Sequence, residues 1–190
     1  MTKKLRFKEH ITKIIKTVYF KMKTLFKIIK SRKTKTWITI YKSYIRPLLE
    51  YAPEAWNPLY KSEINSLERC QKHFTKIVFN KCNLPKLTYR DRLEYLQLQT
   101  LENRRKIYDL ILMYKIINGY THLGLETLFS NPIRKSIRTK NRIISKKQNN
   151  KSSRSFINRS TKMWNILDNK TLISNSPLNF KNKLKSILVV

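Results

Sequence analysis

The carboxylates of this chain are the residues that could bind the metal ions of phosphoryl or nucleotidyl transfer. That chemistry needs clustered carboxylates holding two cations roughly 4 Å apart, because both the attacking and the leaving oxygen must be neutralised. The 11 Asp and Glu residues are scattered, and no two of them are adjacent. Asp91 with Glu94, and Glu102 with Asp109, have spacings that suit helix starts and surface ion pairs. The pattern therefore predicts no two-metal site in this chain.

Histidine and cysteine indicate no other catalytic or metal centre. His10, His73 and His122 lie beside no Ser or Cys in a nucleophile motif. Cys70, His73 and Cys82 lack a fourth ligand in the paired spacing of a structural zinc site. Two cysteines make no disulfide framework, so we expect an intracellular, reducing location, either nucleus or cytoplasm. We predict no catalytic residue, no metal, no cofactor and no enzyme activity for the chain on its own.

Basic residues dominate the charged side chains. The 190 residues include 42 Lys and Arg against 11 Asp and Glu, a formal net charge of +31 at pH 7. A polyanion would relieve this self-repulsion, so RNA or DNA is the expected partner. AT-rich codon usage, which enriches Lys, Asn, Ile, Tyr and Phe together, is a second explanation of the lysine excess. Lysines interrupt every apolar run before the roughly 20 residues that cross a bilayer, so no membrane partner is predicted.

Hydrophobic periodicity predicts the helices that position these basic side chains. From Ile11 to Ile29, apolar residues recur at three- and four-residue steps and therefore share one face of a helix. The lysines of this segment fall largely on the remaining surface, which either is merely solvated or contacts phosphates. The candidate phosphate contacts are Lys16, Lys23, Lys27 and Lys30.

Two further helices are expected before residue 80. One runs from Thr34, as its N-cap, to about Leu49, because Pro53 and Pro58 prevent continuation beyond a rigid turn. Another begins near Ser62, where apolar residues again trace one helical face. These helices would pack with the first one in a bundle.

Capping residues mark the elements that follow. Thr88 and Asp91 have capping-box spacing at the start of a helix. A long helix should begin near Thr100 and end where Asn118 and Gly119 offer a C-terminal cap. The chain has only two glycines, which argues against tight β-hairpins and against a Gly-rich phosphate loop. The predicted fold class is therefore mostly α, a helical bundle followed by a basic loop and a small C-terminal helical segment.

The composition changes between residues 131 and 155, where basic residues stand among Ser and Asn with little apolar content. This segment reads as a basic linker or loop, either a solvated connector or a contact segment for nucleic acid. A short helix is expected over residues 156–167, and Ser176 with Pro177 suits the N-cap and first turn of a last helix. The candidate contacts in the basic segment are Arg134, Arg138 and Arg142.

Four ordered motifs carry a family resemblance. The region after the palm of non-LTR, LINE-like reverse transcriptases resembles residues 41–79, YKSYIRPLLEYAPEAWNPLYKSEINSLERCQKHFTKIVF. The downstream helices of that family are similar to residues 87–119, LTYRDRLEYLQLQTLENRRKIYDLILMYKIING. Its habitual ending resembles SFINRSTKMWNIL and SPLNFKNKLK, and its entry into the post-palm helix resembles LRFKEHI. The motifs occur in the family's order and approximate spacing, and they cover nearly the whole chain.

This resemblance implies a reverse transcriptase thumb and C-terminal tail. Thumb helices of the family lie along the template–primer duplex, so the implied partners are RNA, DNA or an RNA–DNA hybrid, together with the palm and fingers of the parent polymerase. The family's catalytic Asp pair and its Mg²⁺ belong to the palm, which this chain lacks. We expect a helical thumb-like domain over residues 1–130, a basic linker over 131–155 and a helical tail over 156–190.

The resemblance also singles out individual residues. Arg104, Arg105 and Arg159 are candidate nucleic-acid contacts, and acidic partners within the protein are the alternative for the first two. Glu50 should pair with Arg46 near an aromatic corner between two helices. Structural roles are expected for the residues that match the motifs most closely: Arg46, Glu50, Tyr51, Trp56, Pro58, Asn118, Gly119, Trp164 and Asn165.

The leading hypothesis is a C-terminal fragment of a retrotransposon RNA-directed DNA polymerase that binds nucleic acid through charge. One alternative is a stand-alone basic RNA-binding scaffold protein, which does not explain the order of the motifs. A second alternative is a non-functional retroelement remnant, which would expose apolar surface and be marginally stable.

Overall fold

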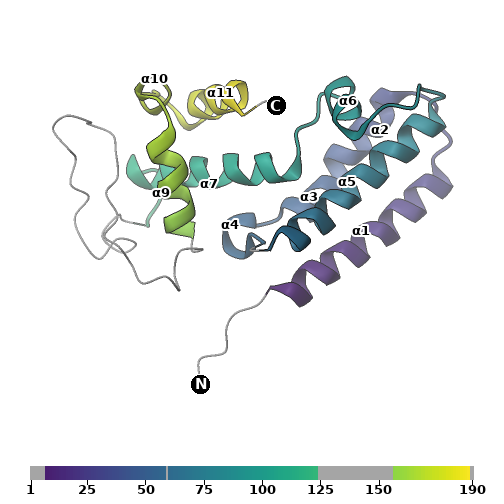
Figure 1. Cartoon of the computed structure of the whole chain (residues 1–190), viewed down its shortest axis with the longest axis horizontal. Helices are drawn as coiled ribbons and strands as arrows, with labels where there is room; N and C mark the ends of the chain where they lie inside the picture. The colour runs from purple at the N-terminus through teal and green to yellow at the C-terminus, as the bar shows by residue number, and fades with distance from the viewer. Residues whose placement is uncertain (1–6, 59, 124–155, 189–190) are drawn as a thin grey trace. The chain divides into compact units, whose positions relative to one another are not determined.

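The computed structural model describes residues 7–58, 60–123 and 156–188, and every regular element in these ranges is a helix (Figure 1). The predicted mostly α fold class is therefore confirmed for this part of the chain. By its internal contacts the chain divides into two compact units, Met1–Arg104 and Arg105–Val190. The boundaries expected near residues 130 and 155 lie outside the described residues and stay predictions.

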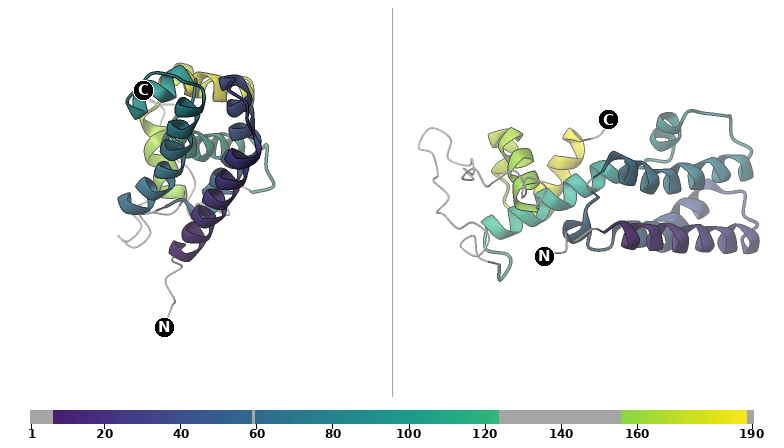
Figure 2. Two further views of the ribbon diagram at one scale, coloured as in Figure 1. Left: turned by 90° about the vertical axis from the view of Figure 1, so that its right-hand side faces the viewer. Right: turned by 60° about the horizontal axis from the view of Figure 1, so that its bottom comes forward.

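Unit 1 is built around two long helices, α1 (Lys8–Ile28) and α5 (Lys61–Lys81), which lie side by side (Figures 1 and 2). A broken helix packs against them and consists of α2 (Thr34–Ile40), the π-helix η1 (Tyr41–Ile45) and α3 (Arg46–Glu50). The short helices α4 (Pro53–Trp56) and α6 (Tyr89–Tyr95) follow α3 and α5 along the chain, and α6 packs on α5.

The core of unit 1 forms because the predicted apolar stripe of α1 faces the other helices. Val18 and Met22 are buried from α1, beside Trp37 and Phe74. The ring of Phe26 lies 4.9 Å from that of Trp37 and 5.2 Å from that of Phe74. This aromatic contact joins α1, α2 and α5, and it fixes which side of α1 faces solvent.

The second predicted helix is interrupted just before Pro47. Sequence periodicity indicates one continuous helix from Thr34, but the structure changes to π-helix over Tyr41–Ile45 before α3. Proline has no N–H to donate and its ring collides with the carbonyl four residues earlier, and a wider turn relieves that collision. The expected N-cap role of Thr34 is also wrong: Lys33 occupies that position and makes no side-chain cap.

Other expected helix ends are confirmed. Thr88 accepts a hydrogen bond from the Asp91 N–H at 3.3 Å, and Asp91 accepts one from the Thr88 N–H at 3.3 Å, which completes the capping box of α6. The long helix α7 (Leu101–Ile117) ends as predicted, with Gly119 at φ 71° and the Tyr120 N–H donating to the Lys115 carbonyl at 2.8 Å. A positive φ at this point is the conformation in which glycine has no Cβ penalty.

Unit 2 contains the rest of α7 with α9 (Phe156–Ile166), α10 (Asn169–Leu172) and α11 (Pro177–Ile187). Its core stacks Tyr114 on Phe180 with ring centroids 4.6 Å apart, and Trp164 packs on the same phenylalanine at 5.7 Å. Ser176 caps α11 as expected, since its hydroxyl accepts the Asn179 N–H at 3.2 Å. The apolar face of α7 was expected within the first domain, whereas these contacts join it to the C-terminal helices.

Candidate nucleic-acid interface

The solvent side of α1 carries a line of lysines. Lys16, Lys23 and Lys27 follow one another at steps of seven and four residues, so they share one side of the helix, and Lys30 follows just after α1 ends at Ile28. All four are exposed, and none forms an ion pair within the part of the chain that the structure describes. At 1.5 Å per residue the helical part of this line, from Lys16 to Lys27, is about 16 Å long. We call these four residues the α1 lysine face.

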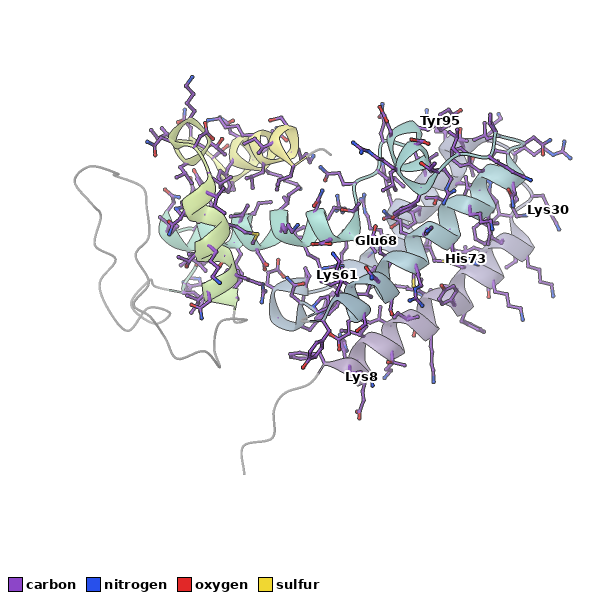
Figure 3. The ribbon with its side chains drawn as sticks, viewed as in Figure 1. Lys8, Lys30, Lys61, Glu68, His73 and Tyr95 are labelled. Atoms are coloured by element: carbon purple, nitrogen blue, oxygen red, sulfur yellow. The ribbon has the colours of Figure 1, made fainter. Side chains whose placement is uncertain are left out.

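The neighbouring helix α5 adds further cations beside α1. His73 lies on α5 (Figure 3), and its ring contacts that of Tyr19 on α1, with ring centroids 5.4 Å apart. Arg69 and Lys76 lie four residues before and three after His73, on the exposed side of α5. Partial burial raises the pKa of Tyr19, and the charge of Arg69 acts in the opposite direction. Arg69 and Lys76 therefore add exposed positive charge on the helix that packs beside α1.

The charge of this surface is not balanced locally. Residues 10–49 contain 11 Lys and Arg and no Asp or Glu. On α1 itself the one carboxylate is Glu9, in the first turn, where it suits the positive end of the helix dipole. Among the described residues, most other carboxylates of unit 1 are already engaged away from α1. The Glu68 carboxylate, for example, accepts the Leu101 N–H at 3.0 Å at the start of α7.

Three arginines predicted as nucleic-acid contacts have other surroundings in the structure. Arg104 makes a bidentate ion pair with Glu50, and its Nη2 lies 2.8 Å from Oε2. Arg159 makes a bidentate pair with Asp109, at 2.7 and 2.9 Å. Arg105 is 2% exposed. Arg104 and Arg159 are paired with carboxylates and Arg105 is buried. The three arginines therefore do not form an open phosphate-binding surface.

The motif residues around the end of α3 have structural positions. Glu50 also lies 3.8 Å from Arg46, so the predicted pairing is present, although Arg104 is the closer partner. Trp56 is buried and its indole N–H donates to the Tyr51 carbonyl at 2.6 Å, which closes the corner between α3 and α4. Pro58 is buried as well, whereas the side chain of Tyr51 is exposed.

The remaining predicted residues fall into two groups. Asn118 and Gly119 end α7, Trp164 belongs to the core of unit 2, and Asn165 beside it is half-buried. The Asn118 side-chain amide donates to the Tyr114 carbonyl at 2.8 Å. A last group lies outside the described residues: Arg134, Arg138 and Arg142.

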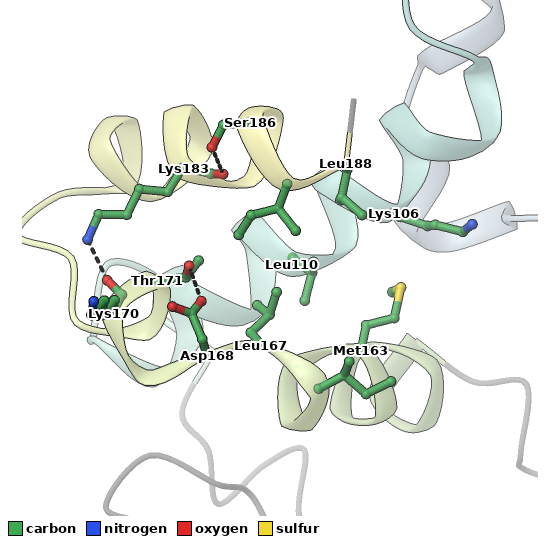
Figure 4. Close-up of a pocket in the computed structure, with 12 residues that line it drawn as sticks. Lys106, Leu110, Met163, Leu167, Asp168, Lys170, Thr171, Lys183, Ser186 and Leu188 are labelled. Carbon is green, nitrogen blue, oxygen red and sulfur yellow. Dashed lines mark hydrogen bonds between the residues drawn. The ribbon is translucent and has the colours of Figure 1, made fainter. Parts of the chain in front are cut away.

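Unit 2 contains an open cavity of about 810 Å³ (Figure 4). Leu110, Leu167 and Leu188 provide apolar lining, and the polar groups at its edge serve helix ends. The Lys183 ammonium donates to the Lys170 carbonyl at 2.6 Å, and the Asp168 carboxylate accepts the hydroxyl of Thr171. Asp168 is the one carboxylate among the residues that line the cavity, and no His or Cys is among them.

The described residues hold no group of three or more His, Cys, Asp or Glu side chains arranged to bind a metal ion. No helix within those residues is long and apolar enough to span a membrane. The expectations of no cofactor and no catalytic activity stay predictions.

Sequence reasoning identified the α1 lysines but missed the contribution of α5. Arg69 and Lys76 stand on the polar side of a helical pattern, and that spacing was a usable signal. Their position beside α1 could not be read in the same way, because it depends on which two helices pack together. The Tyr19–His73 contact is the feature that joins the two surfaces.

Comparisons with known proteins add one distant relative. No protein-family model matches the chain, and no solved structure matches it. Uncharacterized protein B0403.1 of Caenorhabditis elegans is 28% identical over 119 residues, which cover 63% of this chain and 60% of that protein. The chain therefore matches less than two thirds of that relative's length. The name of this relative gives no activity or partner. The resemblance to reverse transcriptases stays a prediction.

Proposed function

We propose that the chain is a thumb-like region of a non-LTR retrotransposon reverse transcriptase and binds nucleic acid through the α1 lysine face. The observation that carries the binding proposal is four exposed lysines, three of them in a line of about 16 Å on α1 and the fourth just after it, without carboxylate partners among the described residues. The order of the sequence motifs supports the family. A stand-alone basic RNA-binding protein would use the same face, but it does not account for that order.

Binding of this kind depends on charge rather than on base identity. Each ammonium that contacts a phosphate releases a condensed counterion, so affinity falls as salt rises. Lysine is a compact point charge on a flexible stem, which tolerates variation in the position of the phosphate. The proposed role is therefore to hold RNA, DNA or a hybrid with little sequence preference, while polymerisation belongs to the palm of the parent enzyme.

The test is binding of a fluorescent single-stranded RNA, followed by anisotropy at several salt concentrations. The variant K16Q/K23Q/K27Q/K30Q removes all four charges of the α1 lysine face. If each lysine contacts one phosphate, the slope of log K against log salt should become less steep by about 2.8, at about 0.7 per contact. The same relation at about 0.15 M salt gives a loss of affinity of about 200-fold.

A matched variant, K42Q/K86Q/K162Q/K185Q, removes the same number of exposed lysines from other surfaces. It should change the slope by less than about 1, because these side chains come from four separate segments of the chain. Equal effects of the two variants would show that total charge, and not the α1 lysine face, carries the binding. Salt-insensitive binding by the unaltered chain would contradict the proposal as a whole.

The family part of the proposal has a separate test. A palm-and-fingers protein from a non-LTR element should bind the chain and extend a primer further in its presence than in its absence. RNA binding without any effect on such a polymerase would favour the stand-alone RNA-binding protein.

A further inference from the structure

Phe20 stands in the middle of the α1 lysine face. It lies four residues after Lys16 and three before Lys23, so the two lysines flank it along one side of the helix. Lys27 follows at seven residues, again on that side. The phenylalanine is 72% exposed, on the side of α1 away from the buried Val18 and Met22. The exposed ring is thus flanked by lysines along this side of the helix.

This exposure sets Phe20 apart from the other phenylalanines that the structure describes. Each of the others is buried or half-buried, and Phe26 of the same helix packs on Trp37 and Phe74. The adjacent Tyr19 is in contact with His73. Phe20 makes no ring contact within the described residues, so core packing does not explain why an aromatic residue stands there.

We infer, on the basis of the proposed function, that the α1 lysine face holds a single-stranded segment and that Phe20 stacks on one of its unpaired bases. Lysine contacts a phosphate whether or not the base is paired. An aromatic ring needs an open base face, which a continuous duplex covers with its neighbouring bases. The combination of a ring with flanking ammonium groups therefore favours a single strand, or the single-stranded part beside a duplex.

The distances along α1 suit this arrangement. Lys16 and Lys23 are seven residues apart, which is about 10 Å along the helix axis. That length corresponds to about three nucleotides at 3.4 Å per step of one strand. A base under Phe20 can therefore lie between the phosphates that the two lysines contact. Phenylalanine has no hydrogen-bonding group, so the stacking should accept any of the four bases.

The test compares Phe20→Ala with the unaltered chain on a single-stranded RNA and on a duplex of the same sequence. Loss of one stacked base should weaken single-strand binding by about 5- to 150-fold. Duplex affinity should stay unchanged, and so should the salt slope, because no phosphate contact is removed. Phe20→Trp should retain single-strand binding, whereas Phe20→Leu, which has no aromatic face, should behave like Phe20→Ala.

Tyr44→Ala is the matched control, since Tyr44 is an exposed aromatic residue of η1 outside the α1 lysine face. It should leave both affinities unchanged. Circular dichroism should give the same helix content for every variant, because Phe20 lies outside the core.

The outcomes separate this inference from the proposed function. Equal weakening on single strand and duplex, or no weakening on either, would overturn the stacking of Phe20. The proposed function would still stand if K16Q/K23Q/K27Q/K30Q lost binding in the same assay. Weaker binding of Phe20→Ala to anionic lipid vesicles with unchanged RNA binding would instead assign the ring to a membrane surface and refute the inference.

Discussion

Replacing Arg104 with methionine removes the guanidinium that neutralises a buried carboxylate. The side chain of Glu50 is 6% exposed. Its carboxylate accepts two hydrogen bonds from the Arg104 guanidinium, and a second cation, the Arg46 guanidinium, lies 3.8 Å from the same carboxylate. Removing one partner of a buried ion pair costs about 3–5 kcal/mol, because it leaves an uncompensated charge out of water. Since Arg46 remains, we expect about 3 kcal/mol. For a chain of this length that loss lowers the melting temperature by about 6–12 °C.

An exposed ion pair of the same unit provides the comparison. Lys61 and Glu102 are 3.4 Å apart, but their side chains are 73% and 34% exposed. Water already solvates both charges, so Lys61→Met should cost less than about 1 kcal/mol. The two substitutions remove one cation each, and burial of the carboxylate is the difference between them.

Urea unfolding measures both effects through tryptophan fluorescence. A Trp164→Phe background leaves Trp37 and Trp56 as reporters, and both are buried in unit 1. Arg90→Met is the control for loss of an exposed arginine, and it should change the free energy of unfolding by less than about 0.5 kcal/mol. The reasoning is refuted if Arg104→Met costs no more than Lys61→Met.

Three further predictions concern a thiol, a helix cap and a core. Burial raises the pKa of Cys70 from 9.0 to about 12, so its thiol should react with Ellman's reagent only after unfolding, whereas the half-buried Cys82 reacts in the folded protein. Because the unfolded thiol ionises first, this residue's contribution to stability should be intact below about pH 9 and lost as pH rises toward 12, which urea titrations at graded pH would detect. Thr88→Ala should cost about 1 kcal/mol in urea unfolding, and Thr88→Ser should not. Trp164→Ala should cost about 3–5 kcal/mol in the transition of unit 2, followed by circular dichroism.

Helix existence and helix ends were largely predictable from the sequence. The apolar stripe of α1, the capping box of Thr88 with Asp91, and the end of α7 at Gly119 depend on residues within about one helical turn of each other. Pro47 was overlooked, although a proline inside a helical pattern is itself a local signal. Its consequence, a π-helical turn over Tyr41–Ile45, is a response of the backbone that periodicity does not report.

The role of each basic residue was much harder to predict. Arg104 finds Glu50 across 54 positions of the chain, and Arg159 finds Asp109 across 50. Nothing in the sequence around Lys16 separates it from these paired arginines, yet Lys16 is exposed. A local pattern can place a cation on the polar side of a helix, but it cannot say whether a distant carboxylate packs against that side.

The sequence by itself therefore determined that this protein is a strongly basic, mostly α chain whose first helix turns lysines away from an apolar stripe. Those properties follow from composition and from the 3.6-residue period of a helix. Only the tertiary structure decided which cations remain open to a partner, and where the apolar face of α7 is buried. The reason is physical: burial and ion pairing depend on contacts between residues far apart in the chain, which packing creates.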